Sequence, residues 1–424
     1  MHVLIIPSEE FVPDANPVAG IFQYHQASIL REAGHKVGVI SIKQTFSIPM
    51  LIKSLLLKSL KKKANNETDD FTFKQVLLLG YRKLFKLKEF ITVENKKGIS
   101  IYRIDGFYYL PPSDVNNRSG WLKAGMIAYQ AYIKENGTPE IIHAHNAVYA
   151  AMLAERIKKN YGITYIVTEH STAFARNTIT SPSLLKYIKA AYKNSNSNYA
   201  VSQPFCNLLE NLFSGISFSC LPNVIDPYLE KKQYVPDIKK ENNEFVFVNI
   251  AELHPKKNHR LLIDAFKKLR LNYPDKAIKL WIGGRGVLQE DLKRQISLLG
   301  LEPEIKLLGQ LNREQVFDAI RNADCFVLSS SYETFGVVLI EAMLLGKPVI
   351  STRCGGPEGF VNEVTGLLVS RDNEDEDLFK AMMQMIESRE EYNPKLISEY
   401  AISEFGQEAF IKRMNTIYNQ IIRS

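Results

Sequence analysis

Short apolar runs alternate with amphipathic stretches along the whole chain, and this pattern predicts alternating strands and helices. In the first half the predicted strands are residues 3–7, 37–42, 99–104, 141–144, 163–168, 198–202 and 218–222, and the predicted helices are residues 22–33, 121–136, 147–159 and 181–194. Strands that are apolar throughout and separated by helices are typical of a parallel sheet covered on both faces. The first half is therefore predicted to be a doubly wound α/β domain.

The second half restarts the same alternation after the polar run 236–244. Its predicted strands are residues 245–250, 278–282, 305–308, 325–328, 348–351 and 366–369, and its predicted helices are residues 259–270, 288–299, 313–322, a helix ending at 345, and helices within 377–422. The turn at 223–227 is the expected hinge. We expect an α/β protein with two Rossmann-like domains, residues 1–225 and 226–404, followed by a last helix at 405–424.

Composition places these elements in a soluble globular protein. The chain has 424 residues, of which 45% are hydrophobic and 23% charged, so it is too long for a single ordinary core. No run approaches the roughly 20 apolar residues of a membrane span, and the first residues form a short strand without a basic leader. Four scattered cysteines predict packing residues in a reducing compartment, and we expect a cytoplasmic protein.

The net charge of +7 is concentrated in one segment. Residues 43–97 hold 13 basic and 5 acidic residues, and their centre, 48–63, mixes leucines with lysines. Such a basic amphipathic helix can bind an anionic membrane surface, so we expect a peripheral position on the cytoplasmic membrane face. The alternative is an insertion packed on its own domain with solvated lysines. A nucleic-acid partner is not expected, because the basic run contains no interleaved aromatic residues.

Two acids, Glu333 and Glu341, stand eight residues apart across the junction of a predicted strand and helix. Glu333 follows the apolar run 325–328, and Glu341 lies further along the helix that begins after Gly336. Helix amides at that junction suit phosphate, whereas carboxylates suit sugar hydroxyls. A second glycine turn follows at residues 355–358, and we expect both acids to face one cleft.

This arrangement resembles the donor site of the large family of retaining glycosyltransferases that includes sucrose, glycogen and mannosyl transferases. The resemblance extends over nearly the whole chain and implies a GT-B fold, with two domains facing across a cleft and the last helix packing back on the first domain. It implies that Glu341 holds the ribose hydroxyls and that Glu333 holds the donor sugar with the amides of Phe335 and Gly336. It places the nucleotide base on the backbone from Gly309 to Leu311.

The stretch after the strand 245–250 extends the resemblance. The family sequence reads Gly-Arg-Leu, three variable residues, Lys and Gly, and Lys257 matches the lysine that pairs with the donor diphosphate. Glu252 replaces the arginine, and Ala251 and Asn258 replace the two glycines. The second phosphate charge is therefore expected to meet either Arg285 or the lysine that precedes Lys257.

Candidates in the first half follow its predicted strands. Gly20 lies between the first strand and the first helix, where a residue without Cβ lets backbone amides approach a diphosphate or an acceptor. His170 ends a strand at the ligand edge of the sheet, and the resemblance implies that it contacts the donor sugar. His143 and His145 lie two residues apart without a third metal ligand nearby, so they are interpreted as fold residues.

The resemblance implies a hexosyltransferase that retains the anomeric configuration and needs neither a metal ion nor a cofactor. Its donor would be a nucleotide sugar, a UDP-sugar ahead of a GDP-sugar, and its acceptor a lipid-linked or cell-surface glycan in polysaccharide biosynthesis. Two alternatives remain open. One is an isomerase similar to nucleotide-sugar 2-epimerases, and the other is a catalytically silent subunit of GT-B fold, which Glu252 in the arginine position favours.

Overall fold

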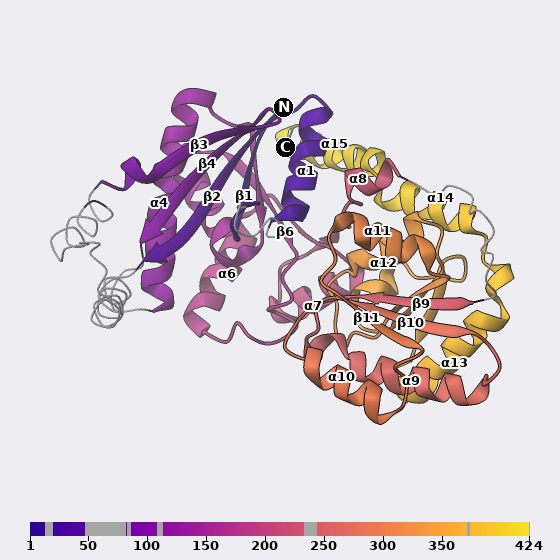
Figure 1. Cartoon of the computed structure of the whole chain (residues 1–424). Helices are drawn as coiled ribbons and strands as arrows, with labels where there is room; N and C mark the ends of the chain where they lie inside the picture. The colour runs from indigo at the N-terminus through magenta and orange to yellow at the C-terminus, as the bar shows by residue number, and fades with distance from the viewer. Residues whose placement is uncertain are drawn as a thin grey trace, which may run out of the picture. The chain divides into compact units, whose positions relative to one another are not determined.

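The computed structural model describes residues 1–12, 20–46, 82, 86–107, 113–232, 244–370 and 374–423. The chain forms two compact α/β units (Figure 1). The first contains residues 1–200, 209–219 and 414–424, and the second contains residues 201–208 and 220–413. Most of the predicted basic segment, including residues 48–63, lies outside the described residues, so the membrane-binding helix stays a prediction.

The first unit is built on a sheet that has eight strands among the described residues, in the order β3-β4-β2-β1-β5-β6-β7-β8. The pairs from β4 to β7 run parallel, whereas β3 runs antiparallel to β4. The strand bounds are β1 His2–Pro7, β2 Lys36–Phe46, β3 Ile91–Lys96, β4 Ile99–Phe107, β5 Ile141–His145, β6 Thr164–Glu169, β7 Ser197–Ala200 and β8 Ser219–Cys220. The order reverses between β1 and β5, and ligands of doubly wound sheets bind outside the strand ends at such a point.

Helices cover this first sheet, and α4, α5 and α6 pack against one another. The bounds are α1 Ile21–Glu32, α4 Asp114–Asn136, α5 Met152–Tyr161, α6 Pro182–Asn194 and α7 Gln203–Leu212. The last helix, α15 (Gln407–Arg423), ends in the first unit. There Tyr418 places its hydroxyl 3.0 Å from Nδ1 of His143, and Asn415 places Oδ1 2.9 Å from Nε2 of His35.

The second unit has a sheet of six parallel strands within the described ranges, in the order β11-β10-β9-β12-β13-β14. The bounds are β9 Phe245–Ile250, β10 Ile278–Gly283, β11 Ile305–Gly309, β12 Cys325–Leu328, β13 Val349–Thr352 and β14 Gly366–Val369. Side chains of β9 and β12 are buried throughout, which explains their continuous apolar runs. From β9 to β11 the strands are added on one side of β9, and from β12 to β14 on the other, so the strand order reverses between β9 and β12. This is the topological switch point of the second sheet.

Helices lie on both faces of the second sheet, with α9, α10 and α13 on one face and α11 and α12 on the other (Figure 1). The bounds are α8 Pro227–Glu230, α9 His259–Asn272, α10 Gln289–Leu298, α11 Arg313–Asn322, α12 Val337–Leu344, α13 Glu374–Glu387 and α14 Pro394–Phe405. Buried aliphatic and aromatic side chains such as Phe247, Phe266, Leu280 and Met382 fill the core between β9, β10 and the helices α9 and α13. The predicted doubly wound α/β architecture is confirmed in both units.

The predicted helix at 147–159 is wrong at its start. Residues Ala147–Ala151 form a π-type turn with non-helical backbone angles at Val148 and Tyr149, and α5 begins only at Met152. Asn146 and Tyr149 have φ values of 70° and 71°, which place them in the left-handed region. The hydroxyl of Ser8 holds this turn by donating to the carbonyl of Val148.

The cysteine prediction holds for three of the four residues. Cys206, Cys325 and Cys354 are buried, as packing residues should be, but Cys220 at the end of the short strand β8 is exposed. Among the described residues no helix is long and apolar enough to cross a membrane.

Candidate functional site

The loops after β9 and β12 lie next to each other because these two strands pair at the switch point of the second sheet. The first loop ends in a 3-10 turn, Pro255–Lys257, and backbone and hydroxyl bonds fix the second loop against it. The amide of Ser331 donates to the carbonyl of Lys256 at 2.8 Å, and the hydroxyl of Ser329 donates to the carbonyl of Lys257 at 2.9 Å. The two loops therefore form one surface.

Lys257 and Glu333 meet on this surface. The ammonium of Lys257 donates to Oε1 of Glu333, and the hydroxyl of Ser330 donates to the same oxygen at 2.7 Å. The two charged side chains are only 16% and 12% exposed. Because a buried charge is costly without a partner, each residue neutralises the other.

The backbone of Glu333 belongs to a short extension of the sheet. Its amide donates to the carbonyl of Cys354 at 2.7 Å, and its carbonyl accepts from the amide of Gly356 at 2.8 Å. Glu333 and Gly355 accordingly form an isolated parallel bridge. A Cβ at Gly356 would lie 2.3 Å from Cα of Phe335, so the second glycine turn is required by a close approach of two backbones.

The residues between Glu333 and α12 offer two backbone donors. Phe335 is 3% exposed, and its ring packs 5.1 Å from that of Phe360 and 5.7 Å from that of Phe405. Gly336 precedes α12 with a φ of 97°. Within the described part of the chain, neither amide donates a hydrogen bond to the protein. Since buried amides are rarely left unpaired, these two are available for an acceptor group on a ligand at the positive end of the helix.

Glu341 lies in α12, one helix turn past its start, and its side chain is partly exposed. Burial raises the pKa of this carboxyl to about 7, and the nearby Arg313 acts in the opposite direction. The group therefore changes charge near neutral pH, which is unusual for a glutamate and typical of functional positions.

The remaining candidates of the second unit lie at the ends of β10 and β11. The carbonyl of Gly309 accepts from the amide of Gly284 at 2.7 Å, and Leu311 packs so closely on Gly283 that a Cβ there would lie 2.7 Å from Cδ1 of Leu311. Arg285 is exposed, and its carbonyl accepts from the amide of Leu253 at 3.0 Å. The structure brings Lys257 and Glu333 into contact. It places Gly309, Leu311 and Arg285 at or just after the ends of the neighbouring strands β10 and β11.

Asn258 explains how this chain keeps the turn without the family glycine. Its φ of 49° and ψ of 44° are left-handed, and its side chain makes no capping bond to α9. Replacing Asn258 with alanine is expected to lower the free energy of unfolding by about 1 kcal/mol, because Asn tolerates this region better than other residues with a Cβ. Asn258→Gly is the control and should stay within about 0.5 kcal/mol of wild type. Urea denaturation measures both, and equal losses would contradict the explanation.

In the first unit His170 follows β6 and contacts a second histidine that sequence analysis interpreted as a fold residue. Nε2 of His170 lies 3.0 Å from Nδ1 of His145, and the rings of His145 and His143 stack at 4.2 Å. Burial lowers the pKa of His143 to about 3 and that of His145 well below its usual range, so both are neutral at pH 7. No sequence signal indicated this contact, because it follows from the pairing of β5 with β6, which sets His145 opposite Thr168, two residues before His170.

The buried carboxylate of Glu169 organises the loops around His170. It accepts from the amide of Ala147 at 2.8 Å, from the hydroxyl of Tyr192 at 2.8 Å and from the amide of Ser171 at 3.0 Å. Burial raises the pKa of Glu169 to about 6 despite these donors. The sequence did not indicate a role for Glu169, because a single acid at the end of an apolar strand belongs to no recognisable motif.

Gly20 sits at the start of α1 with a φ of 68°. A Cβ at this position would lie 2.8 Å from the carbonyl oxygen of Glu10, so the packing of two backbone segments requires the glycine. Residues 13–19, which precede it, lie outside the described residues. Among the described side chains, no group of three or more His, Cys, Asp or Glu is placed to hold a metal ion.

Two family profiles match consecutive parts of this chain. The profile described as Glycosyltransferase Family 4 matches residues 91–228, and the profile described as Glycosyl transferases group 1 matches residues 230–402. The boundary between the two matches falls close to the predicted hinge.

Curated relatives with a glycosyl group in their names match different lengths of the chain. N-acetyl-alpha-D-glucosaminyl L-malate synthase of Bacillus anthracis is 25% identical over 77% of this chain and 84% of its own length. The N-acetylgalactosamine-N,N'-diacetylbacillosaminyl-diphospho-undecaprenol 4-alpha-N-acetylgalactosaminyltransferase of Campylobacter jejuni is 30% identical over 51% of this chain and 61% of its own length. Mannosylfructose-phosphate synthase of Agrobacterium fabrum is 34% identical, but the match spans only 33% of this chain and 32% of that protein.

Solved structures share the fold over the whole chain. Sucrose-phosphate synthase from Thermosynechococcus elongatus is similar with a TM-score of 0.68 at 18% identity, covering 100% of both chains. HepE of Anabaena, solved in complex with UDP, is similar with a TM-score of 0.67 at 18% identity, covering 99% of this chain and 100% of HepE. With two α/β units, a family profile on each half and this likeness over its full length, the chain belongs to the glycosyltransferases of GT-B fold and is family-4-like.

Proposed function

We propose that this glycosyltransferase moves a hexose from a nucleotide sugar to a lipid-linked or cell-surface glycan and retains the anomeric configuration. A UDP-sugar is the proposed donor ahead of a GDP-sugar, and HepE, which has this fold, was solved with UDP. The Campylobacter jejuni relative carries diphospho-undecaprenol in its name, which supports an acceptor attached to a lipid.

The contact between Lys257 and Glu333 at the switch point of the second sheet carries the proposal. When a donor binds, the ammonium of Lys257 is proposed to turn to the diphosphate, and Glu333 to accept from hydroxyls of the donor sugar. The amides of Phe335 and Gly336 would donate to the sugar or the phosphate beside the start of α12. The buried ion pair would thus be exchanged for ligand bonds, so that neither charge is left unpaired.

The proposed reaction exchanges one bond at the anomeric carbon and moves one proton. The acceptor hydroxyl oxygen bonds to the anomeric carbon on the face from which the diphosphate leaves, and the bond from that carbon to the diphosphate oxygen breaks. The hydroxyl proton passes to the departing diphosphate. Two of the three relatives described above carry alpha in their names, which means retention if their donors are α-linked. We propose that no metal ion is needed, since Lys257 and the helix amides supply positive charge to the leaving group.

The other proposed roles follow from position. Glu341 would hold the ribose hydroxyls, the backbone at Gly309 and Leu311 the base, and Arg285 the second phosphate charge. In the first unit, His170 would contact the sugar, with its ring held by His145. The chain is proposed to work at the cytoplasmic membrane face, because residues 43–97 are strongly basic.

A catalytically silent subunit is the second candidate, and one observation favours it. Glu252 is an exposed acid in the position where the family has an arginine, so it would face the donor diphosphate with the wrong sign. Such a protein would keep the fold and bind a nucleotide sugar without turning it over.

A panel of nucleoside diphosphates and nucleotide sugars, each with and without magnesium, tests the proposal by thermal shift. A ligand that binds only the folded state raises the melting temperature by mass action. We expect a shift with uridine nucleotides that does not depend on magnesium, followed by transfer to an added acceptor. Binding without transfer would favour the silent subunit, and no shift with any nucleotide would overturn the proposal.

The pKa of Glu341 gives this binding a predicted pH dependence. Raising the pH from 6 to 8 is expected to tighten UDP-glucose binding about tenfold, because the ionised fraction of a group with a pKa of about 7 rises by that factor. The direction of this pH dependence follows from the proposed role of Glu341. Only its carboxylate form can accept from both ribose hydroxyls, so binding lowers the pKa of Glu341 and the affinity rises with pH. UDP-glucose is the probe because both of its phosphates are esterified and keep a constant charge over this range.

Isothermal titration of wild type and Glu341→Gln at both pH values measures the effect. The variant should bind more weakly at pH 8 and show less than a twofold difference between pH 6 and pH 8. If the variant keeps the wild-type slope, another group titrates, and the ribose role of Glu341 is wrong.

A further inference from the structure

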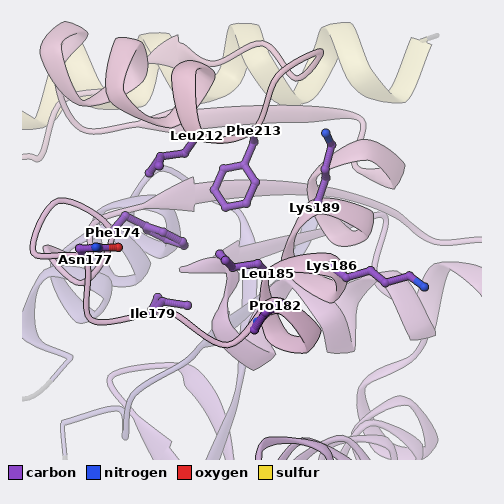
Figure 2. A pocket seen from close by; sticks show the side chains of 9 residues that line it. All are labelled: Phe174, Asn177, Ile179, Pro182, Leu185, Lys186, Lys189, Leu212 and Phe213. Atoms are coloured by element: carbon purple, nitrogen blue, oxygen red, sulfur yellow. The ribbon is translucent and has the colours of Figure 1, made fainter.

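A pocket of about 360 Å³ opens in the first unit (Figure 2). It lies between the loop that follows His170, the helix α6 and the end of α7. Apolar side chains make up most of its lining: Phe174, Ile179, Pro182, Leu185, Leu212 and Phe213. Nothing in the proposed chemistry uses this pocket.

The floor of the pocket is made of buried, closely packed aromatic rings. The rings of Phe174 and Phe213 are 6% and 3% exposed and meet edge to face with centroids 5.5 Å apart. Tyr192 packs against Phe213 from below, with its ring centroid at 5.3 Å. By contrast, Leu212 at the edge is 54% exposed, so an apolar surface continues outward from the hollow. This shape suits an apolar ligand that enters from solvent.

The pocket carries positive charge on one side only. Figure 2 shows Lys186 and Lys189 on the α6 side, with their amino groups pointing away from the apolar hollow. Both are exposed, and within the described ranges neither makes an ion pair or hydrogen bond with the protein. The 40 residues from His170 to Leu209 contain four basic residues and no acid, and acids flank this stretch at Glu169 and Glu210. An anionic group at the mouth would therefore be attracted.

The floor also connects to the residues around His170. The hydroxyl of Tyr192 donates to Glu169 at 2.8 Å, and Glu169 immediately precedes His170. Three pocket residues, Phe174, Asn177 and Ile179, belong to the loop that starts at His170. A ligand in the pocket is therefore held by the same loop that carries a residue proposed to contact the sugar.

We propose that this pocket binds the hydrocarbon chain of the acceptor lipid, with the phosphate of that lipid on Lys186 and Lys189. This inference rests on the proposed function, because it names the acceptor as an amphiphile with an anionic phosphate next to an alkyl or isoprenoid chain. The apolar lining takes the first part of the chain, and each methylene removed from water adds about fourfold to the affinity. Exposed lysines suit a phosphate, which remains partly in water.

The test titrates the full chain with farnesyl phosphate below its micelle concentration. Wild type is expected to bind it at least tenfold more tightly than inorganic phosphate or farnesol, because the site needs both parts. The double variant Lys186→Glu/Lys189→Glu should lose at least tenfold. Lys193→Glu is the matched control, since Lys193 is exposed on the same helix but does not line the pocket, and it should stay within twofold.

A second pair of variants tests the apolar half. Leu212→Glu is expected to weaken farnesyl phosphate binding at least tenfold but to leave the folded state intact, since Leu212 is already 54% exposed. Leu298→Glu, at an 84% exposed leucine of the second unit, is the control and should have no effect. The proposal is overturned if wild type binds inorganic phosphate as well as farnesyl phosphate, if it binds only vesicles or micelles, or if a control weakens binding as much as its partner.

UDP-glucose titrations of the same variants separate this inference from the proposed function. Normal nucleotide binding without farnesyl phosphate binding would contradict the proposed lipid pocket but not the proposed transferase function. If the protein binds farnesyl phosphate but no nucleotide, the proposed transferase function is contradicted instead.

Discussion

Replacing Glu333 with alanine is expected to lower the rate of sugar transfer by about a thousandfold or more, with little change in the folded structure. In the proposed mechanism this carboxylate holds the donor sugar while the bond to the diphosphate breaks. The loop should keep its shape, because its bonds to Cys354 and Gly356 come from the backbone of residue 333. The measurement is kcat/KM with a radiolabelled donor sugar, with circular dichroism as the check on folding.

The matched control for this experiment is Glu363→Ala. Glu363 is exposed in a turn of the same unit, and the same substitution there should leave kcat/KM within twofold of wild type. Glu333→Gln adds a second test, because it keeps the size of the side chain and removes the charge. If kcat/KM of Glu333→Ala stays within tenfold of wild type, the role assigned to Glu333 and the proposed donor site are both wrong.

Lys257→Ala is expected to lower kcat by about a hundredfold to a thousandfold, the usual loss when one stabilising donor of a developing anion is removed. The substitution removes the ammonium that meets the leaving diphosphate, and it also leaves Glu333, which is 12% exposed, without its partner. We therefore expect a lower melting temperature as well as a slower reaction, because an unpaired buried carboxylate destabilises the fold.

Two variants separate the catalytic effect from the structural one. Lys257→Met/Glu333→Gln removes both charges together, so it should recover much of the lost stability but none of the activity. Lys306→Ala changes an exposed lysine on β11 and should alter neither quantity. If the double variant regained transfer, Lys257 would have only a structural role.

The sequence predicted those elements that have a clear apolar or amphipathic run. The bounds of β9, β12 and β14 agree with the predicted strands, and α11 was placed correctly at Arg313–Asn322, because each is an apolar or amphipathic run with clear polar ends. Asn312 marks the start of α11 with a capping box. Its side chain accepts from the amide of Gln315, and the side chain of Gln315 accepts from the amide of Asn312.

Elements whose hydrophobic pattern is weak or misleading escaped prediction. The edge strand β3 (Ile91–Lys96) is mostly exposed and alternates weakly, so only its antiparallel pairing with β4 identifies it. Helix α7 (Gln203–Leu212) begins with a polar residue and a proline, which looked like a loop. The turn at Ala147–Ala151 looked like a helix because its residues are good helix formers, and only the backbone angles at Asn146 and Tyr149 break it.

The candidate site divides in the same way. Lys257 and Glu333 were placed on two neighbouring strand ends by motif spacing, and the structure joins them. The contact of His145 with His170 and the three bonds of Glu169 could not be predicted, because they depend on the register of β5 with β6 and on the position of α6. The pocket beside α6 had no sequence signal, since its lining comes from three separate segments.

The loops of the second unit are joined largely through main-chain atoms, and this makes the protein a favourable scaffold for redesign. The bonds from Ser331 to Lys256, from Glu333 to Cys354 and from Gly284 to Gly309 use only amides and carbonyls. Exposed side chains on these loops, such as Glu252 and Arg285, can therefore be exchanged without loosening the framework that carries them. A library randomised at those two positions would explore new donor nucleotides at little cost in stability.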